Sequence, residues 1–300
     1  MKQLNRILSV TLCAIILLSF GVPSVAAQQD MEIIQMDEVV LNEFERLEYM
    51  STRSVEELQY MGISRQEAES IKNFRELMQT HFYELSLLDD DTLLILGYTE
   101  EQVAILRDFD GSDQRMQLLS ANLTFSPRIH SYTNFTSITL TRVVIAVTWR
   151  WNTQPTFLFT DSIVFAWNHN FVFQSNSTIS IEYVHRSNPS DIVFGQGSLW
   201  LTGLADRGVG FRIPMRPPNG PAFDTHFARS GSFNFTLDRH AQIHPRDFLV
   251  YAAYYRTLLS VSLSLSVSSS GPSITVTPGL ATSRSAWAQF DGTNRIIRSG

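Results

Sequence analysis

The sequence predicts a two-part α+β protein: a small N-terminal helical module with a duplicated helix-turn-helix unit, then an all-β antiparallel sandwich or Greek-key barrel. Between Gln28 and Leu119 the chain has 21 acidic and 7 basic residues, a net charge of −14. From Ser120 to Gly300 it has 8 acidic residues and 14 basic ones, all Arg, a net charge of +6. Apolar residues recur at helical spacing in the first part and at every second position in the second. We therefore divide the mature chain into residues 28–119 and 120–300.

The first 27 residues have the features of a secretory signal peptide. Lys2 and Arg6 precede an apolar run from Ile7 to Phe20, and the small residues 25–27 offer a cleavage site. Cys13, the single cysteine, lies inside this segment, so the exported chain would contain no disulfide and no thiol nucleophile. Export without disulfides is typical of bacterial secreted proteins. We therefore expect residues 1–27 to be a signal peptide and the protein to be bacterial and extracellular.

The first element expected after the signal is an amphipathic helix over residues 36–50. Its apolar residues fall on one helix face. They are Val39, Val40, Phe44, Leu47 and Met50.

Next come two segments, residues 58–74 and 93–109, which align without gaps and indicate an internal duplication. The matching apolar pairs are Leu58/Leu93, Met61/Leu96, Ile63/Tyr98, Ala68/Val103, Ile71/Leu106 and Phe74/Phe109. Gly62 and Gly97 can adopt the left-handed conformation that ends a helix. Each is followed by a capping box that starts a second helix. These boxes are Ser64 with Glu67, and Thr99 with Gln102.

The turn of each repeat, Leu58-Gln-Tyr-Met-Gly62 in the first, resembles the loop of ubiquitin-associated helical hairpins, which carries a Leu-x-x-Met-Gly-aromatic pattern. The resemblance covers 17 residues per repeat and implies a backbone geometry. In an exported bacterial chain it does not imply ubiquitin binding. Two interpretations remain for the repeats, a self-packing helical unit and an acidic docking surface. Asp89, Asp90 and Asp91 are expected to cap the helix that follows them.

The sequence of the second part, residues 120–300, predicts about nine short strands separated by turns. In residues 143–151 the alternating residues Val143, Ile145, Val147, Trp149 and Trp151 share one face, with Thr148 and Arg150 on the other. Further strands are expected near residues 163–167, 171–173, 179–183, 199–204, 233–237, 248–254, 261–267, 274–276 and 287–290. The connections 188–197 and 213–223 are predicted to be loops that could carry function.

All five tryptophans lie in this part, and exposed indole rings could stack on a sugar. Trp149, Trp151 and Trp167 share faces with aliphatic or aromatic residues, which favours the core for them. Trp200 and Trp287 remain candidates for ligand binding.

No catalytic residue can be assigned, and we expect no cofactor. The β part has no Cys or Lys and a single Glu, Glu182. A usual glycosidase needs two carboxylates, and nothing in the spacing of the seven Asp residues of this part pairs one of them with Glu182. The common hydrolase, zincin and dinucleotide motifs are missing. The candidate metal ligands are Asp224, His226, His240, His244 and Asp247, because imidazole and carboxylate are suitable zinc ligands.

The β part bears on two further kinds of partner, nucleic acid and membrane. The Arg residues are scattered without a basic run, so we expect no nucleic-acid binding. The Ser/aliphatic alternation around residues 261–267 is similar to a membrane-inserting hairpin, but Pro278-Gly279 interrupts the returning arm. Membrane insertion is therefore an alternative and not the main expectation.

These observations favour a non-enzymatic secreted protein whose β-sandwich binds a partner or a cell-surface component. The opposite charges suggest that the acidic helical module docks on the Arg-bearing part or masks it. One alternative is a membrane-active, pore-forming protein that uses the Ser-rich hairpin. The other is a metal-dependent hydrolase that uses His226, His240 and His244.

Overall fold

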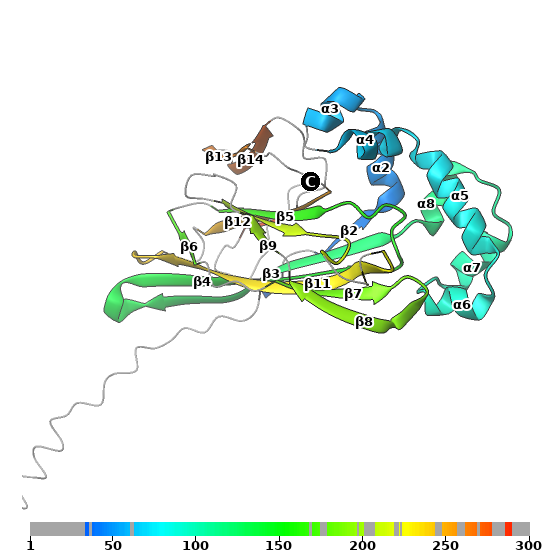
Figure 1. The fold of residues 1–300 in the computed structure, drawn as a ribbon. Helices are drawn as coiled ribbons and strands as arrows, with labels where there is room; N and C mark the ends of the chain where they lie inside the picture. The colour runs from blue at the N-terminus through cyan, green and yellow to red at the C-terminus, as the bar shows by residue number, and fades with distance from the viewer. Residues whose placement is uncertain are drawn as a thin grey trace, which may run out of the picture.

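Seven α-helices gather at one end of a sandwich of β-sheets in the described part of the chain (Figure 1). The computed structural model describes residues 34–35, 38–60, 63–167, 170–174, 179–196, 198–200, 208–218, 222, 224–243, 248–256, 262–268, 271–277 and 286–289. The expected signal peptide, Gly62, His244 and Asp247 lie outside these residues. The predicted α+β class, with a helical part followed by an antiparallel sandwich, is confirmed.

The helices of the N-terminal module match the two repeats that the sequence predicts. Its helices are α2 (Glu43–Ser51), α3 (Val55–Tyr60), α4 (Arg65–Lys72), α5 (Phe74–Ser86), α6 (Asp90–Ile95), α7 (Glu100–Arg107) and α8 (Asp113–Leu119). Both predicted capping boxes are present, at the start of α4 and of α7. Gly97 has a φ of 99°, the left-handed conformation that ends the preceding helix. Asp89 caps α6 through the backbone N–H of Thr92.

The helices pack on a shared apolar core. Its members include Leu58, Ile71 and Phe74 of the first repeat and Leu93 and Leu106 of the second, all fully buried.

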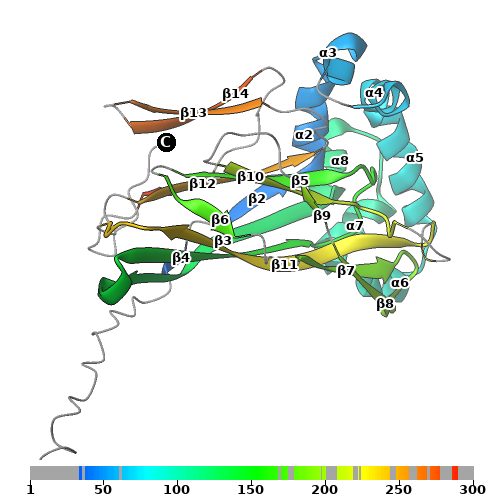
Figure 2. The ribbon, with the colours of Figure 1, turned by 60° about the vertical axis from the view of Figure 1, so that its left-hand side comes forward.

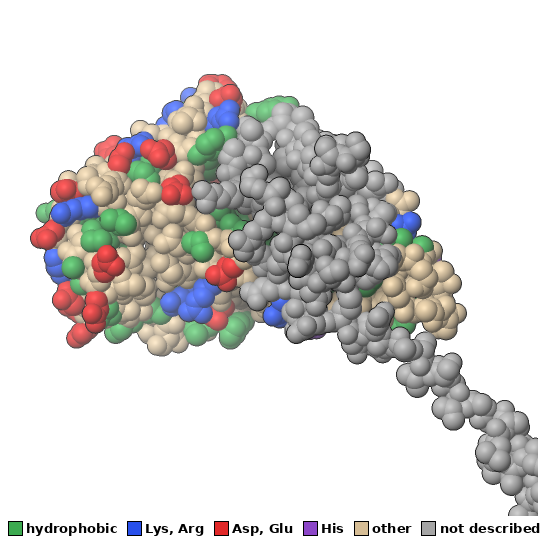
Figure 3. Space-filling view, turned by 180° about the vertical axis from the view of Figure 1, so that it is seen from behind, with side chains coloured by type: hydrophobic (Ala, Val, Ile, Leu, Met, Phe, Trp, Pro, Cys, Tyr) green, Lys and Arg blue, Asp and Glu red, His purple; other side chains and the backbone are tan. Residues whose placement is uncertain are grey.

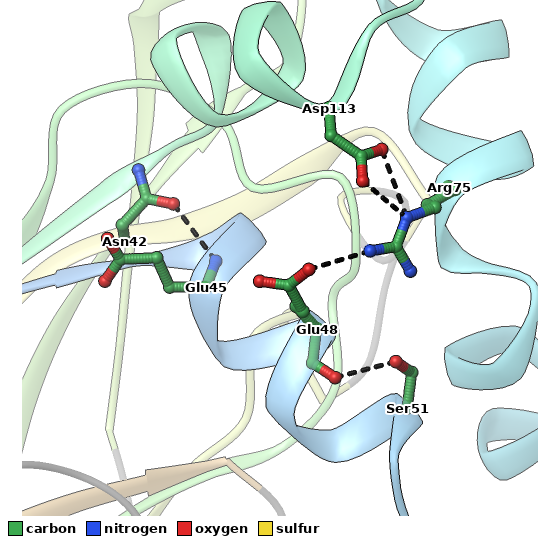
Figure 4. A network of polar contacts seen from close by, with 6 residues as sticks. All are labelled: Asn42, Glu45, Glu48, Ser51, Arg75 and Asp113. Atoms are coloured by element: carbon green, nitrogen blue, oxygen red, sulfur yellow. Dashed lines mark hydrogen bonds and ion pairs between the residues drawn. The ribbon is translucent and has the colours of Figure 1, made fainter.

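Arg75 of α5 joins three helices at the edge of this core. It bonds Glu48 of α2 and Asp113 of α8 (Figure 4), and its guanidinium lies 4.6 Å from the centre of the Phe74 ring.

One expectation for this module is wrong in part. The helix predicted over residues 36–50 begins only at Glu43, because Val39–Asn42 forms strand β2 and pairs with residues 122–125. Phe44, Leu47 and Met50 are buried on α2 as predicted. Val39 and Val40 fit helical spacing, but they lie beside a strand edge that is formed by residues far along the chain. The available backbone hydrogen bonds therefore override the local pattern.

The strands form two sheets and a separate hairpin. Their bounds are β1 (Ile34–Gln35), β3 (Asn122–Phe135), β4 (Leu140–Trp151), β5 (Asp161–Trp167), β6 (Val172–Gln174), β7 (Ile179–His185), β8 (Asn188–Gln196), β9 (Ser198–Trp200), β10 (Gly208–Ile213), β11 (His226–Arg239), β12 (Leu249–Arg256), β13 (Ser262–Ser268), β14 (Gly271–Thr277) and β15 (Ala286–Gln289). The larger sheet has the order β1-β3-β4-β11-β7-β8, with β2 on β3 and β6 on β11. The smaller sheet has the order β15-β12-β5-β10-β9, and β13 pairs with β14.

The core of the sandwich lies between these two sheets. Phe165 of β5 contacts Phe235 of β11 with ring centres 4.8 Å apart, which joins the smaller sheet to the larger one. Trp149, Trp151 and Trp167 are 2%, 0% and 1% exposed, so their predicted place in the core is confirmed.

The connection predicted over residues 188–197 is wrong, because Asn188–Gln196 is strand β8 at the edge of the larger sheet. Most of its side chains are exposed, and Pro189 lies near its start. An edge strand needs hydrogen bonds on one side only, so it can form without a buried face or a regular apolar alternation. The sequence of residues 188–196 therefore lacks the apolar alternation by which a strand is predicted.

A segment of the β part completes the core of the helical module. Phe157 and Phe159, in the connection between β4 and β5, pack among the helices. The fully buried carboxylate of Glu43 accepts hydrogen bonds from the backbone N–H groups of Thr156 and Phe157, at 2.9 and 3.1 Å. We call residues 152–160 the junction loop, because it belongs to both halves.

No helix in the described ranges is both long and apolar enough to cross a membrane. Acidic side chains are spread over the helical end of the surface in Figure 3.

Candidate functional site

A shallow hollow of about 490 Å³ lies on the outer face of the larger sheet. No described helix covers this face in Figures 1 and 2. We call this hollow the sheet-face trough. Hydroxyl side chains line it on four neighbouring strands; they are Thr124, Ser126, Thr148, Ser180, Ser230 and Ser232.

The strand register explains why these hydroxyl groups come together. Directly paired residues of neighbouring strands point to the same face of a sheet. One row across the sheet is Thr124, Arg150, Ser230, Glu182 and Phe194. The next outward-facing row is Ser126, Thr148, Ser232, Ser180 and Gln196. Small side chains in the middle of both rows leave space between larger ones, which produces the trough.

Charged side chains of both signs surround the hydroxyl groups. Arg150 and Glu182 stand on either side of Ser230, and the Ser126 hydroxyl donates to the Glu38 carboxylate at 2.9 Å. Burial lowers the pKa of Arg229, the nearby Arg150 lowers it further, and Glu182 opposes them. The trough thus offers hydrogen-bond donors and acceptors without a strong net charge. At its far wall, the Phe194 ring is 72% exposed.

Gly231 of β11 makes the floor of the trough possible. It lies opposite Trp149 on the core-facing side of the sheet. A Cβ atom at Gly231 would stand 2.7 Å from the Trp149 indole and 2.8 Å from the Ser180 carbonyl oxygen. Because real Cβ contacts are longer than this, only glycine lets the indole lie across β11.

Two of the predicted metal ligands, His226 and His240, lie far apart in the structure, whereas His244 and Asp247 lie outside the described residues. His226 begins β11, whereas His240 follows the opposite end of this 14-residue strand. At about 3.3 Å per residue the two histidines are roughly 45 Å apart, so a single ion cannot touch both. Among the described residues, no group of three or more His, Cys, Asp or Glu side chains is arranged to hold a metal ion.

His226 has other neighbours. Its Nδ1 atom is 2.8 Å from the Thr225 hydroxyl, and its Nε2 atom is 3.7 Å from the Asp191 carboxylate. Its ring stands edge-on to His185, with centres 5.1 Å apart. Asp224 is exposed and lies 4.0 Å from Arg216. His226 thus has a hydroxyl, an imidazole and a carboxylate as its neighbours at the end of the sheet.

Trp200 and Trp287, the predicted ligand-binding tryptophans, lie in the smaller sheet. Trp200 ends β9, and Trp287 lies in β15 and pairs with Tyr251. Both strands belong to the other sheet from the trough, so these two residues and the trough are separate candidates.

The sequence predicts part of the residues of the sheet-face trough but not their assembly into one site. The alternation in residues 143–151 places Thr148 and Arg150 on the face opposite the apolar one. The alternation does not show which strands lie side by side. The trough forms because β11 pairs with both β4 and β7. Alternating small hydroxyl residues in 124–126 and 230–232, and the polar Ser180 and Glu182 on one face of 180–182, are the signal that could indicate a polar, uncovered face.

A second hollow, of about 570 Å³, lies between the helices and the junction loop. Its lining includes Leu77 and His81 of α5, Leu158 of the junction loop, and Arg216. Burial and the positive charge of Arg186 lower the pKa of His81 to about 4. We call this hollow the junction cleft.

No known protein-family model matches the chain, and no curated protein is detectably similar to it.

Proposed function

We propose that the protein is a secreted, non-enzymatic binding protein and that the sheet-face trough binds a glycan chain of a cell surface or a matrix. The observation that carries this proposal is the double row of hydroxyl side chains between Arg150, Glu182 and the exposed Phe194. Sugars present many hydroxyl groups and apolar C–H faces. A polar array beside an aromatic ring is complementary to both.

The spacing of the carboxylates favours binding over hydrolysis. Glu182 lies on β7, and Glu38 is bound to Ser126 on β3, three strands away in the sheet. Three strand spacings are about 14 Å. Glycosidases hold their two carboxyl groups about 5–9.5 Å apart. The trough therefore supports recognition of an intact chain.

The helical module has a different role in this proposal from the mask expected from charge alone. Gly97, in the turn before α7, lies close to Arg229 of β11, since a Cβ atom added at Gly97 would stand 3.4 Å from Arg229 Nη2. We propose that the helical module supports the end of the sheet on which it packs.

The proposal is tested by binding of the full mature chain to insoluble cellulose, chitin and xylan, followed by calorimetry with oligosaccharides of any that bind. Ser232→Arg, which places a long side chain across the trough, should abolish binding. Phe194→Ala should weaken binding about fivefold to tenfold, because a stacked ring contributes about 1 kcal/mol.

Tyr83→Ala is the matched control, since Tyr83 is an aromatic residue on α5 that is 63% exposed. This variant should bind as the wild type does. Equal loss in the Phe194 and Tyr83 variants, or undiminished binding by Ser232→Arg with an unchanged fold, would disprove the trough as the binding surface.

A further inference from the structure

Strand β8 is the longest end strand of the two large sheets. It has nine residues and ends the larger sheet beyond β7 (Figure 1), whereas the end strands β1, β9 and β15 have two, three and four. No strand in the described ranges pairs with the outer side of β8. The outer side of an edge strand presents a row of backbone N–H and C=O groups that can pair with a further strand.

The features that discourage strand pairing are confined to the first part of β8. Pro189 and Asp191 lie there, and the pairing with β7 shifts its register between Asn188 and Ile192. Proline, a charged side chain and a bulge each protect an edge strand from a further strand. From Ile192 to Gln196 the register is regular, and the residues are Ile, Val, Phe, Gly and Gln. This second part of β8 is therefore an edge without such protection.

Apolar side chains on both faces of this segment are exposed to solvent. Ile192 and Phe194 share the outer face of the sheet and are 43% and 72% exposed. Val193 points to the opposite face and is 38% exposed, although Tyr183, its pairing partner on β7, is fully buried. The cover of the sheet thus ends at β8, and a strand added beyond it would shield apolar surface on both faces.

We propose that Ile192–Gln196 pairs with the same segment of a second copy of the chain, antiparallel about a two-fold axis through Phe194. Phe194 then lies opposite Phe194 of the second copy, Ile192 opposite Gln196, and Val193 opposite Gly195. None of these pairs brings charges together, and aromatic pairs across neighbouring strands are favourable. Because both copies use the same surface, the contact closes as a dimer and does not extend into a fibre. This interface does not depend on glycan binding.

The direction of this pairing also suits the charge of the helical module. The turn between β7 and β8 lies at the helical end of the sandwich, where the charge of Arg186 acts on His81 of α5. In an antiparallel pair the two copies of this turn lie at opposite ends of the joined sheet. The two helical modules, each with a net charge of −14 over residues 28–119, are therefore kept apart, which limits their repulsion.

The first test is sedimentation velocity on the full mature chain. A dimer should form at about 100 µM and dissociate on dilution, as a contact of micromolar affinity does. Val193→Lys should weaken the dimer about tenfold or more, because a lysine on an edge strand opposes further pairing. Val40→Lys is the matched control, since Val40 is a 55% exposed valine of β2, at the opposite side of the same sheet. This variant should dimerise as the wild type does.

A cross-link keeps the test valid if Val193→Lys fails to fold. Cys13 lies in the predicted signal peptide, so Phe194→Cys gives the mature chain a single thiol. Directly opposed residues of two antiparallel strands are within reach of a disulfide, so mild oxidation should join two copies of this variant. Val40→Cys should stay unlinked.

Three results would overturn the proposal. The wild-type chain could be monomeric at every concentration measured, which would leave the edge to a strand of a different protein. Val193→Lys could dimerise as tightly as Val40→Lys. Finally, Phe194→Cys could form a covalent dimer no faster than Val40→Cys.

Discussion

The carboxylate of Glu43 accepts a hydrogen bond from the backbone N–H of Phe157 at 3.1 Å, across 114 positions of sequence. Glu43 is the first residue of α2, where the helix dipole also favours a negative charge. One buried side chain thus connects the start of the helical module to the junction loop.

Replacement of Glu43 by Ala should lower the free energy of unfolding by about 2–4 kcal/mol, because two backbone N–H groups lose their acceptor. Glu43→Gln, which keeps one oxygen, should lose less. Urea unfolding followed by tryptophan fluorescence measures both. The control is Glu56→Gln, a charge change in the first turn of α3 at an exposed position. Equal stabilities for the Glu43 and Glu56 variants would contradict the structural role of Glu43.

The helical module should not fold when it is expressed alone as residues 28–119. Its core would then lack Phe157 and Phe159, which pack among the helices. Far-ultraviolet circular dichroism should show reduced helicity compared with a fragment that extends to residue 160. In the full chain, Phe157→Ala should cost about 3–5 kcal/mol. Native helicity and a cooperative melt in fragment 28–119 would show that the module is self-sufficient.

The stability of the protein should depend on His81 between about pH 6.5 and pH 4. Burial, reinforced by Arg186, lowers the folded pKa to about 4, whereas the unfolded value is near 6.5. The unfolded chain therefore binds a proton first, so the contribution is complete above pH 6.5 and is lost as the pH falls towards 4. The full difference corresponds to about 3 kcal/mol. Chemical unfolding across this range should give a shallower pH dependence for His81→Asn, and parallel curves would contradict the assignment.

Gly231→Ala should destabilise the larger sheet by about 1–3 kcal/mol, because the new methyl group would overlap the Trp149 indole. The fluorescence of the native state should shift as the indole moves. Ser232→Ala is the neighbouring control, since Ser232 points to the exposed outer face. An unchanged melting temperature in Gly231→Ala would mean that the indole does not need the glycine.

Local chemistry was enough to predict the helical repeats. A capping box involves residues three apart, so Ser64 with Glu67 and Thr99 with Gln102 could be recognised without any tertiary information. The buried tryptophans were also predictable, since the two-residue period assigns each side chain to a face.

Features that depend on distant neighbours could not be predicted. Val39 and Val40 became a strand because β3 supplies a pairing edge more than eighty positions later. The junction loop follows the boundary drawn at residue 120, yet its phenylalanines belong to the helical core. Neither hollow has a sequence signature, because each one is lined by segments that only the fold brings together.

The order of strands in the larger sheet also has a consequence for biogenesis. Of the strands in this sheet, β11 is synthesised last, yet it lies in the middle, between β4 and β7. Until residues 226–239 emerge, β4 and β7 each present an open edge that could pair with another chain. The nascent protein therefore has to be kept from aggregating until its central strand arrives, and a chain truncated before residue 226 would have no means of closing that gap.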